Sequence, residues 1–519
     1  MRWNQRRIRL GVLAAALLVA LVAMLPVTLT PGVRARLTGA LGERFDSDVD
    51  IQALRVSVLP RLRVSGEGIV LRHRGRTDVP PLIGIGSFTA EASLFGLLGL
   101  PLRLTRVRLD GLEIHVPAGG MDIDNDNDED ARRAEADAGS ASRSPLVVGQ
   151  VVSERAVLHI LRGEPGRRPR VFEIAHLSME DAGSNDPWAF TATLTNPTPP
   201  GRIDAAGSFG PWNASVPSAT RLDAEYTFHD ADLGVFNGIG GILQSAGAFE
   251  GVLERIEVTG HADVPDFALE NVGRAVPLTT RFHAVVDGTS GDTTLDPVDA
   301  RLIDSPIVAR GGVIEEAGED GRTITLDVVM ADARIEDVLR LAVSTPDPPM
   351  TGALHLRTRL VLPPGDADAI DKLRLDGSFE IATAQFTSGN VQAKVDELSQ
   401  RAQGEPEEAP DRVASDLRGQ FVMRDGVIQF SNVTFSVPSA NISLDGRYTV
   451  RSKALDFQGT VRLDAKLSEL TTGVKSFLLR IVDPLVRRKD VTVIPVTIGG
   501  TADKPDFGVD LGRAFTPGD

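Results

Sequence analysis

Cysteine is absent from the 519 residues of this chain. Its absence excludes disulfide bonds, thiolate zinc sites and cysteine nucleophiles. It is also typical of bacterial proteins outside the cytoplasm, where free thiols would be oxidised. An excess of basic residues is missing too, because 71 Asp and Glu outnumber 55 Lys and Arg and give a net charge of −16. We therefore expect no nucleic-acid partner.

Recognisable motifs of catalysis are missing as well. The eight histidines are scattered, and none belongs to the His-Glu-x-x-His pattern of a zinc site. The chain has neither a Gly-x-Ser-x-Gly elbow nor a phosphate-binding Gly-x-x-x-x-Gly-Lys loop. "GIGGIL" at Gly238–Leu243 lacks the spacing and the acidic follower of a dinucleotide-binding loop. We predict that the protein is not an enzyme and uses no cofactor or metal.

Charge is missing from Leu10 to Thr30, in a run of 21 residues. Such a run is long enough to cross the ~30 Å hydrocarbon core of a bilayer. Four arginines precede it and put the N-terminus in the cytoplasm by the positive-inside rule. A cleaved signal peptide is the alternative, but the run is long and has no clear small-x-small site near its end. We expect a single-pass anchor in a bacterial inner membrane, with the bulk of the chain in the periplasm.

Segments with the pattern of short strands make up most of the sequence after the uncharged run. After a short helix in "VRARLTGALGER", with Val33, Leu37, Ala40 and Leu41 on one face, apolar residues recur at every second position. "LDFQGTVRLDAKL" and "TGALHLRTRLVLP" are the most regular of these segments. Each predicts a strand with one dry and one wet face. We expect a mainly β protein with a mostly antiparallel sheet.

Two later segments have helical spacing. In "ADARIEDVLRLAV", Asp332 is a candidate N-cap, and Ile335 and Val338 share one face. An amphipathic helix is predicted over 468–488, where a basic flank follows the apolar stripe. It either packs on the end of the sheet or contacts lipid headgroups. Its predicted contact residues are Val474, Phe477, Leu478 and Ile481.

The apolar pattern stops over 119–145, where Asp, Asn, Ala and Ser dominate. No face of this segment could be buried, so it is predicted to be a disordered insertion. Asp124, Asp126, Asp128 and Glu135 fall at positions 1, 3, 5 and 12 of a calcium loop. Position 6 should be Gly and is Glu129, which favours a solvated charged loop over a calcium site.

Two pairs of segments indicate a β unit that is used more than once. "GHADVPDF" at Gly260–Phe267 is nearly the same peptide as "GTADKPDF" at Gly500–Phe507. We interpret both as hairpin joints, with Pro and Asp at the turn. At an offset of 135, "LDPVDARLIDSPIVARGGV" from Leu295 aligns with "FSNVTFSVPSANISLDGRY" from Phe430. Each copy predicts a strand, a turn with Ser and Pro, and a second strand.

The sequence resembles the AsmA-like family of bacterial envelope proteins, which is related to TamB-like proteins and to repeating β-groove lipid transporters. The resemblance lies in the order of the segments "SDVDIQALRVSVLPRLRVSGEGIVL", "LTRVRLDGLEIHV", "LRGQFVMRDGVIQFSNVTFSVPSANISLDGRYTV" and "VIPVTIGGTADKPDFGVDL". It implies an inner-membrane anchor, followed by an elongated, curved periplasmic β-groove with an apolar interior. It also implies a role in outer-membrane biogenesis.

We therefore expect five segments: an anchor over 1–30, an N-terminal AsmA-like module over 31–118, the insertion over 119–145, a middle region over 146–365 and a C-terminal AsmA-like module over 366–519. The expected function is to carry phospholipid acyl chains along the groove, with an envelope protein as a further partner. The alternative is a tethered scaffold for assembling outer-membrane proteins, with a filled core. The predicted groove-lining residues are Leu354, Leu356, Leu360, Leu455, Phe457, Val461, Leu463 and Leu467.

Overall fold

The computed structural model describes residues 30–57, 62–77, 79–93, 95–96, 99, 101–116, 146–161, 169–214, 216–316, 321–387, 392, 415–437, 440–463, 492–502 and 504–509. The anchor up to residue 29, the insertion over 119–145 and the helix over 468–488 lie outside this set, and so does Leu467. Within the described ranges, no helix combines the length and the apolar character that a bilayer crossing requires.

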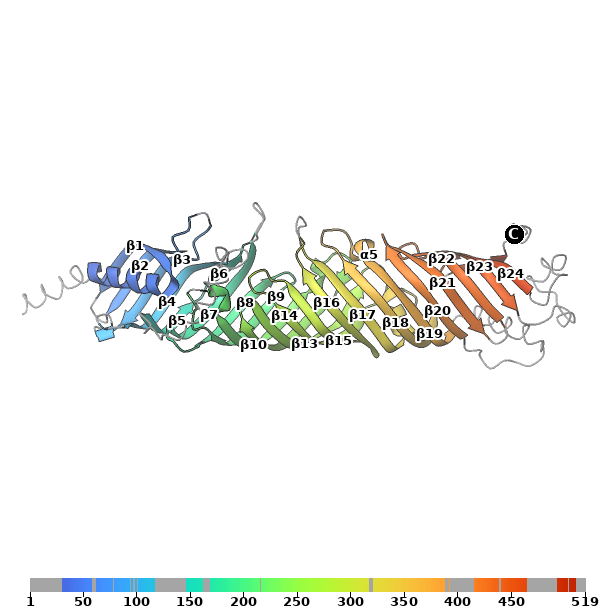
Figure 1. The fold of residues 1–519 in the computed structure, drawn as a ribbon, viewed down its shortest axis with the longest axis horizontal. Helices are drawn as coiled ribbons and strands as arrows, with labels where there is room; N and C mark the ends of the chain where they lie inside the picture. The colour runs from blue at the N-terminus through green and yellow to red at the C-terminus, as the bar shows by residue number, and fades with distance from the viewer. Residues whose placement is uncertain are drawn as a thin grey trace, which may run out of the picture. The chain divides into compact units, whose positions relative to one another are not determined.

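Strands make up most of the described chain, as the alternating pattern predicts (Figure 1). Helices are few: a helix over 30–45, α4 (Ile335–Ala342) and α5 (Ala369–Lys372), with the short 3₁₀ turns η1 (Pro217–Ala219) and η2 (Leu233–Val235). The chain forms two compact units. Unit 1 contains residues 1–231, 245–259 and 285–291, and unit 2 contains residues 232–244, 260–284 and 292–519.

Unit 1 is a sheet whose strands pair in chain order, except that β5 and β6 both lie between β4 and β7. Its strands are β1 (Ser47–Ser57), β2 (Arg63–His73), β3 (Ile83–Ala92), β4 (Leu102–Val116), β5 (Leu146–Ser153), β6 (Ala156–Ile160), β7 (Arg170–Ala182), β8 (Trp188–Pro197), β9 (Pro200–Phe209) and most of β10 (Arg221–Asp232). Pairing is antiparallel except that β4 runs parallel to both β5 and β6.

The helix over 30–45 covers one face of unit 1. Val33, Leu37 and Ala40 are buried against the side chains of β1 to β4, as the spacing in "VRARLTGALGER" predicts. At the end of this helix, the Arg44 guanidinium donates to the carbonyl oxygens of Ser184 (3.4 Å) and Trp212 (3.2 Å). Burial lowers the pKa of Arg44, because the charged form loses hydration.

Unit 2 is also mostly antiparallel. Its strands are β11 (Ile239–Gly240), β15 (Thr293–Leu302), β16 (Ser305–Ile314), β17 (Thr323–Arg334), β18 (Met350–Leu362), β19 (Arg374–Phe386), β20 (Ser415–Arg424), β21 (Val427–Val437), β22 (Ala440–Thr449), β23 (Ala454–Leu463), β24 (Thr492–Thr501) and β25 (Lys504–Val509). Strands β15 to β25 pair successively. Residues of β12 (Ile242–Val252), β13 (Arg255–Leu269) and β14 (Val276–Val286) are divided between the units.

The hairpin repeat predicted at an offset of 135 is confirmed in its register. Leu295 pairs with Gly311 in β15–β16, and Phe430 pairs with Gly446 in β21–β22. Both hairpins then shift register at the equivalent step, Leu295/Val298 in one and Phe430/Val433 in the other. A bulge bends its strand and increases the local twist. The two segments therefore build the same bent hairpin.

Further bulges bend the middle of unit 2. Register shifts interrupt four successive pairings, from β17–β18 to β20–β21. Asp332, Thr383 and Asn432 adopt left-handed φ values of 55°, 53° and 52° at or beside such shifts. The prediction that Asp332 caps a helix is wrong, since β17 continues to Arg334, which precedes α4 without a side-chain cap. The bulge accounts for the polar residue at this position.

The interpretation of the octapeptides as two hairpin joints is wrong for the first copy. Gly260–Phe267 lies wholly inside β13. Pro265 and Asp266 are both exposed, and the Asp266 carboxylate accepts a hydrogen bond from the Ile242 backbone N–H (2.9 Å). In the second copy the chain does turn, but between Thr501, where β24 ends, and Lys504, where β25 begins. The Asp266 carboxylate thus binds a backbone N–H within the sheet and does not form a turn.

Candidate functional site

One face of unit 2 is apolar from β17 to β24. In one row across the sheet, Val328, Thr358, Gly377, Phe421, Phe430, Gly446, Phe457 and Ile498 pair in turn. Directly paired residues project from the same face of a sheet, and so do residues two apart along a strand. Leu360 therefore shares this face with its partners Leu326 and Leu375. Arg359, on the opposite face, has Asp327 and Asp376 as partners.

The groove residues predicted on β18 and β23 lie on this apolar face. Leu354 and Val461 are buried, with 1% and 7% of their surface exposed. Four further residues of the prediction are half-buried: Leu356, Leu360, Leu455 and Phe457. Leu463 is paired with Ala440 and Thr492 at the end of β23. Leu467 and the predicted helix contacts Val474, Phe477, Leu478 and Ile481 lie outside the described residues.

The prediction included Phe457 but missed three phenylalanines that cluster with it on the same face: Phe379, Phe421 and Phe430. Phe379 lies 6.3 Å from Phe421 and 6.1 Å from Phe430, ring centroid to ring centroid, and Phe430 lies 5.7 Å from Phe457. Tilted and edge-on arrangements at such distances are favourable for aromatic pairs. The signal was present in the alternation of "LDGSFEIATAQF" and "GQFVMRDGVIQF", which puts these rings on the parity of the leucines.

Glycines beneath the rings give them room. A Cβ on Gly446 would lie 2.5 Å from Cγ of Phe457, its cross-strand partner. A Cβ on Gly419 would lie 3.2 Å from the ring of Phe379, again its partner. The two rings therefore occupy space that a side chain at Gly446 or Gly419 would fill, an arrangement that protects glycine in a strand.

Elements at both ends of β18 fold onto the apolar face. α4 precedes this strand, and its Ile335 and Val338 pack against Met330, Leu354 and Ile381. α5 follows the strand at its other end (Figure 1), and its Ile370 is buried in a cluster with Met423 and Val450. Both helices thus contact side chains of the same face, one at each edge of the sheet, where an edge is the border formed by the ends of the strands.

The segment between β13 and β14 joins these two helices. At one end, the Arg274 N–H donates to the carbonyl of Arg340 in α4 (2.9 Å), and Gly273 lies against Leu341. Next to them, Val272 belongs to the buried cluster of Ile370 in α5. The same two neighbouring residues, 272 and 273, therefore contact elements from opposite ends of β18. The two edges of the sheet are bridged here over its apolar face.

A second link joins the same two edges. The Lys453 ammonium, in the turn between β22 and β23, donates to the hydroxyl of Ser344, just after α4 (2.8 Å). In that turn Arg451 pairs with Asp368 and Asp371 beside α5, each at 2.9 Å. The hydrogen bond from Arg451 lowers the pKa of Asp371. We call this set of contacts, from residues 272–274 to Lys453, the seam.

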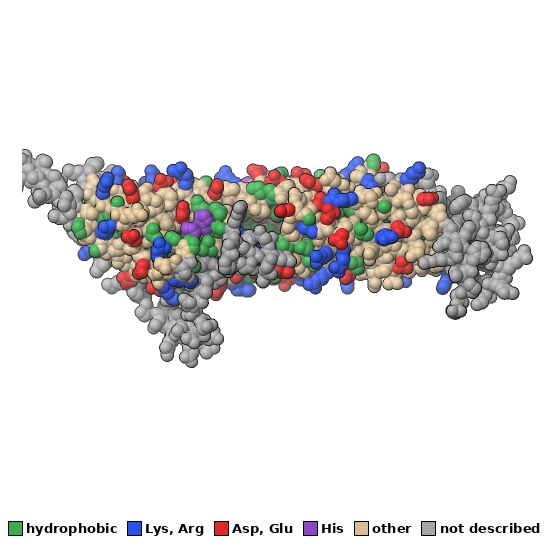
Figure 2. Space-filling view, turned by 90° about the horizontal axis from the view of Figure 1, so that it is seen from above, with side chains coloured by type: hydrophobic (Ala, Val, Ile, Leu, Met, Phe, Trp, Pro, Cys, Tyr) green, Lys and Arg blue, Asp and Glu red, His purple; other side chains and the backbone are tan. Residues whose placement is uncertain are grey.

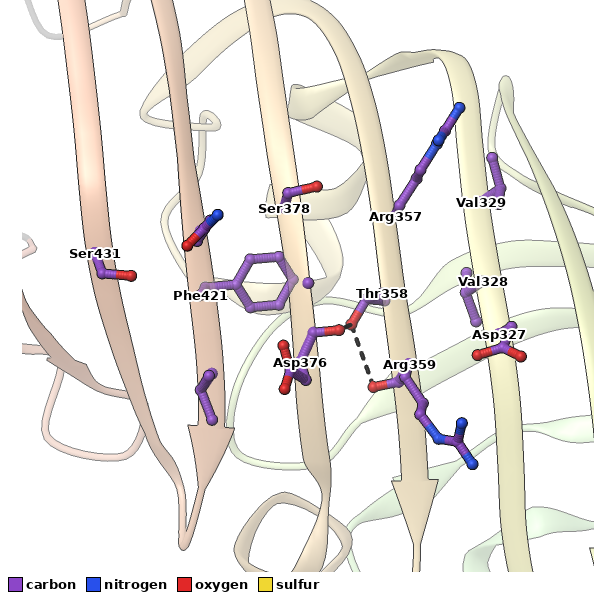
Figure 3. Close-up of a pocket in the computed structure, with 13 residues that line it drawn as sticks. Asp327, Val328, Val329, Arg357, Thr358, Arg359, Asp376, Ser378, Phe421 and Ser431 are labelled. Carbon is purple, nitrogen blue, oxygen red and sulfur yellow. Dashed lines mark hydrogen bonds between the residues drawn. The ribbon is translucent and has the colours of Figure 1, made fainter.

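A depression with a volume of about 520 Å³ lies across β17 to β21 of unit 2, and its lining includes residues from both faces of the sheet (Figure 3). In Figure 3 the Phe421 ring points from β20 toward β19, where Gly377 has no side chain. Thr358 donates through its hydroxyl to the carbonyl of Asp376 (3.2 Å). The lining residues are Asp327, Val328, Val329, Arg357, Thr358, Arg359, Asp376, Gly377, Ser378, Gln420, Phe421, Val422 and Ser431.

The chemistry of this depression is that of a charged surface. Arg359 stands between Asp327 and Asp376 in the register, so its charge faces acidic partners on both sides. Among the described residues, no group of three or more His, Asp or Glu is placed to hold a metal ion. On the face drawn in Figure 2, the described Lys and Arg side chains are interspersed with Asp and Glu. The larger feature is the apolar face, which extends from β17 to β24.

No family model matches the chain, and searches of curated proteins and of solved structures found no match. Function is therefore inferred from the geometry of the chain itself.

Proposed function

We propose that this protein is an inner-membrane-anchored envelope protein that carries phospholipid acyl chains along the apolar face of its sheet. The observation behind this proposal is that Phe379, Phe430, Phe457, Leu356 and Leu360 remain half-buried although the seam bridges the sheet above their face. Side chains in a filled core are packed to crystal-like density and exclude solvent. Partly exposed aromatic and leucine side chains in a bridged interior favour an apolar occupant.

An acyl chain fits the chemistry of this face. Burying a chain gains ~0.8 kcal/mol per methylene, and the row of apolar positions continues from strand to strand without an intervening charge. A chain that slides along such a face exchanges one set of apolar contacts for an equivalent set. The proposed mechanism is passive partition, without a catalytic step.

The proposal includes the elongated, curved groove and the membrane anchor over 10–30 that the AsmA-like resemblance implies. The repeated bulges of unit 2 support curvature, because each one bends its strand toward the next. The periplasmic location and the role in outer-membrane biogenesis are part of the same proposal.

A second candidate function is a membrane-tethered scaffold for envelope assembly, with a dry interior. The two buried clusters under α4 and α5 favour it, because they already fill the apolar face at both edges. The two candidates differ in whether phospholipid touches the middle of the face.

Photo-crosslinking in cells that express the full chain distinguishes them. Benzoylphenylalanine replaces Phe430 on the apolar face or, as a matched control, its exposed neighbour Gln429 on the polar face. We expect a covalent phospholipid adduct at position 430 and none at 429, detected by mass spectrometry of the purified protein. Adducts at neither position support the scaffold, and equal adducts at both contradict the assignment of lipid to this face.

A further inference from the structure

Phe95 is the most exposed large hydrophobic side chain in the described part of the chain, at 90%. It lies between β3 and β4, where the Gly96 N–H donates to the Ser93 hydroxyl (2.9 Å) and the Gly99 N–H to the Phe95 carbonyl (2.8 Å). These bonds hold a local turn with the ring outside it. In sequence Phe95 belongs to "LFGLLGL", which has no charged residue. A single exposed apolar side chain is common on protein surfaces, so the surroundings of Phe95 decide what it can contact.

The position of Phe95 in unit 1 is set by the strand register. Ser57 at the end of β1 pairs with Arg63 at the start of β2, and Arg63 pairs with Glu91 near the end of β3. The segment that carries Phe95 connects β3 to β4 at this same edge. His73 and Ser47 pair at the opposite edge, where the His73 ring lies 3.3 Å from the Phe45 carbonyl.

The helix over 30–45 begins toward the edge of Phe95. It ends at Phe45, at the opposite edge, and Arg34 near its start donates to the carbonyl oxygens of Ile51 and Gln52 in the middle of β1. The helix therefore runs antiparallel to β1, and residue 30 lies on the side where β1 ends. The uncharged run over 10–30 leads directly into that end of the helix.

Basic side chains surround this edge. Arg55, Arg63 and Arg103 are exposed on β1, β2 and β4. Arg63 forms an exposed ion pair with Glu91 (3.6 Å). Positive charge near a membrane surface is attracted to anionic lipid headgroups. The charge of the edge and the apolar residue at its tip thus suit the same partner.

We propose that Phe95 inserts into the membrane at the level where headgroups meet acyl chains, so that this edge of unit 1 rests on the bilayer. Apolar residues of interfacial segments typically enter to a depth of ~5–10 Å. This inference rests on the membrane attachment in the proposed function and is independent of lipid carriage. The edge then has a second, surface contact with the bilayer in addition to the anchor.

Depth-dependent fluorescence quenching tests the inference, and the absence of cysteine allows single labelling. The full chain with Phe95→Cys is labelled with a nitrobenzoxadiazole dye and reconstituted into vesicles of phosphatidylethanolamine and phosphatidylglycerol. A nitroxide on the upper acyl chain of the lipid is the quencher. The matched control is Val171→Cys, an exposed apolar residue (36%) near the opposite edge of unit 1. We expect the label at 95 to lose most of its fluorescence and the label at 171 to keep it.

Flotation of the vesicles separates the outcomes. Flotation with equal, weak quenching at both positions overturns the insertion of Phe95 and favours a protein partner for this edge. Failure to float overturns the membrane attachment as well. Neither result bears on the phospholipid adduct at position 430, so lipid carriage is tested separately. In a further variant the dye is attached at Gly96→Cys, so that Phe95 itself can be changed. Adding Phe95→Glu to this variant should abolish the quenching if the phenyl ring drives insertion, and unchanged quenching contradicts that role.

Discussion

Replacement of Asp337 by alanine should release α4 from the sheet. Asp337 is fully buried (0% exposed) and accepts hydrogen bonds from the hydroxyl of Ser305 (2.8 Å) and the guanidinium of Arg340 (3.3 Å). Ser305, also fully buried, would be left without this acceptor, at a cost of about 1–3 kcal/mol, and each charge-assisted bond contributes about 1.5–3 kcal/mol. Arg340 is 45% exposed and regains water. The expected loss is therefore about 3 kcal/mol, at the lower end for a broken buried ion pair.

Hydrogen exchange measured by mass spectrometry reports this loss locally. A loss of about 3 kcal/mol corresponds to exchange on the order of 100-fold faster for the amides of α4. The control is Asp304→Ala, which removes the exposed pair between Asp304 and Arg334 (3.1 Å; 59% and 55% exposed) in the same region. Surface pairs contribute about 0–1 kcal/mol, so exchange should change about fivefold or less. Equal effects of the two variants would refute the reasoning from burial.

Two further outcomes are expected. Cysteines at Ser344 and Lys453, joined by a short bismaleimide, should lock the seam and suppress the phospholipid adduct at position 430 if lipid enters through it; an unchanged adduct assigns entry to another route. Burial, and then the positive charge of the stacked His159 ring 4.6 Å away, lower the pKa of His115 from its ordinary 6.5. The unfolded chain then binds the proton more readily, so the melting temperature of the protein should fall as the pH drops below 6.5 and not above it, and His115→Gln should weaken this dependence.

The fold was predictable from the sequence where the signal is local. Alternation placed Leu356 and Phe457 on one face because side chains alternate strictly along a strand. The repeat between Leu295 and Phe430 predicted a hairpin that is used twice, and the structure adds a register shift at the same step of both copies. The position of the predicted lining residues on β18 and β23 follows from the same periodicity.

Long-range pairing explains what the sequence did not reveal. The Pro-Asp of Gly260–Phe267 carries a turn signal, but the N–H of Ile242 binds the Asp266 carboxylate and keeps the segment in β13. The seam is equally hidden, because Val272 and Ile370 lie in ordinary apolar contexts in the sequence and only the tertiary fold brings them together. The phenylalanine cluster required knowledge of which strands are neighbours, which a single sequence does not supply.

The seam also constrains the order in which the chain can fold. Its contacts are far apart in sequence: 109 residues separate Ser344 from Lys453, and 80 separate Asp371 from Arg451. Synthesis proceeds from the N-terminus, so residues 272–274 emerge well before their partners in α4 and α5. Contacts of such separation are slow to form and leave apolar edges exposed in the meantime. The part of the sheet whose seam partners have not yet been synthesised is therefore where a nascent chain most needs a chaperone.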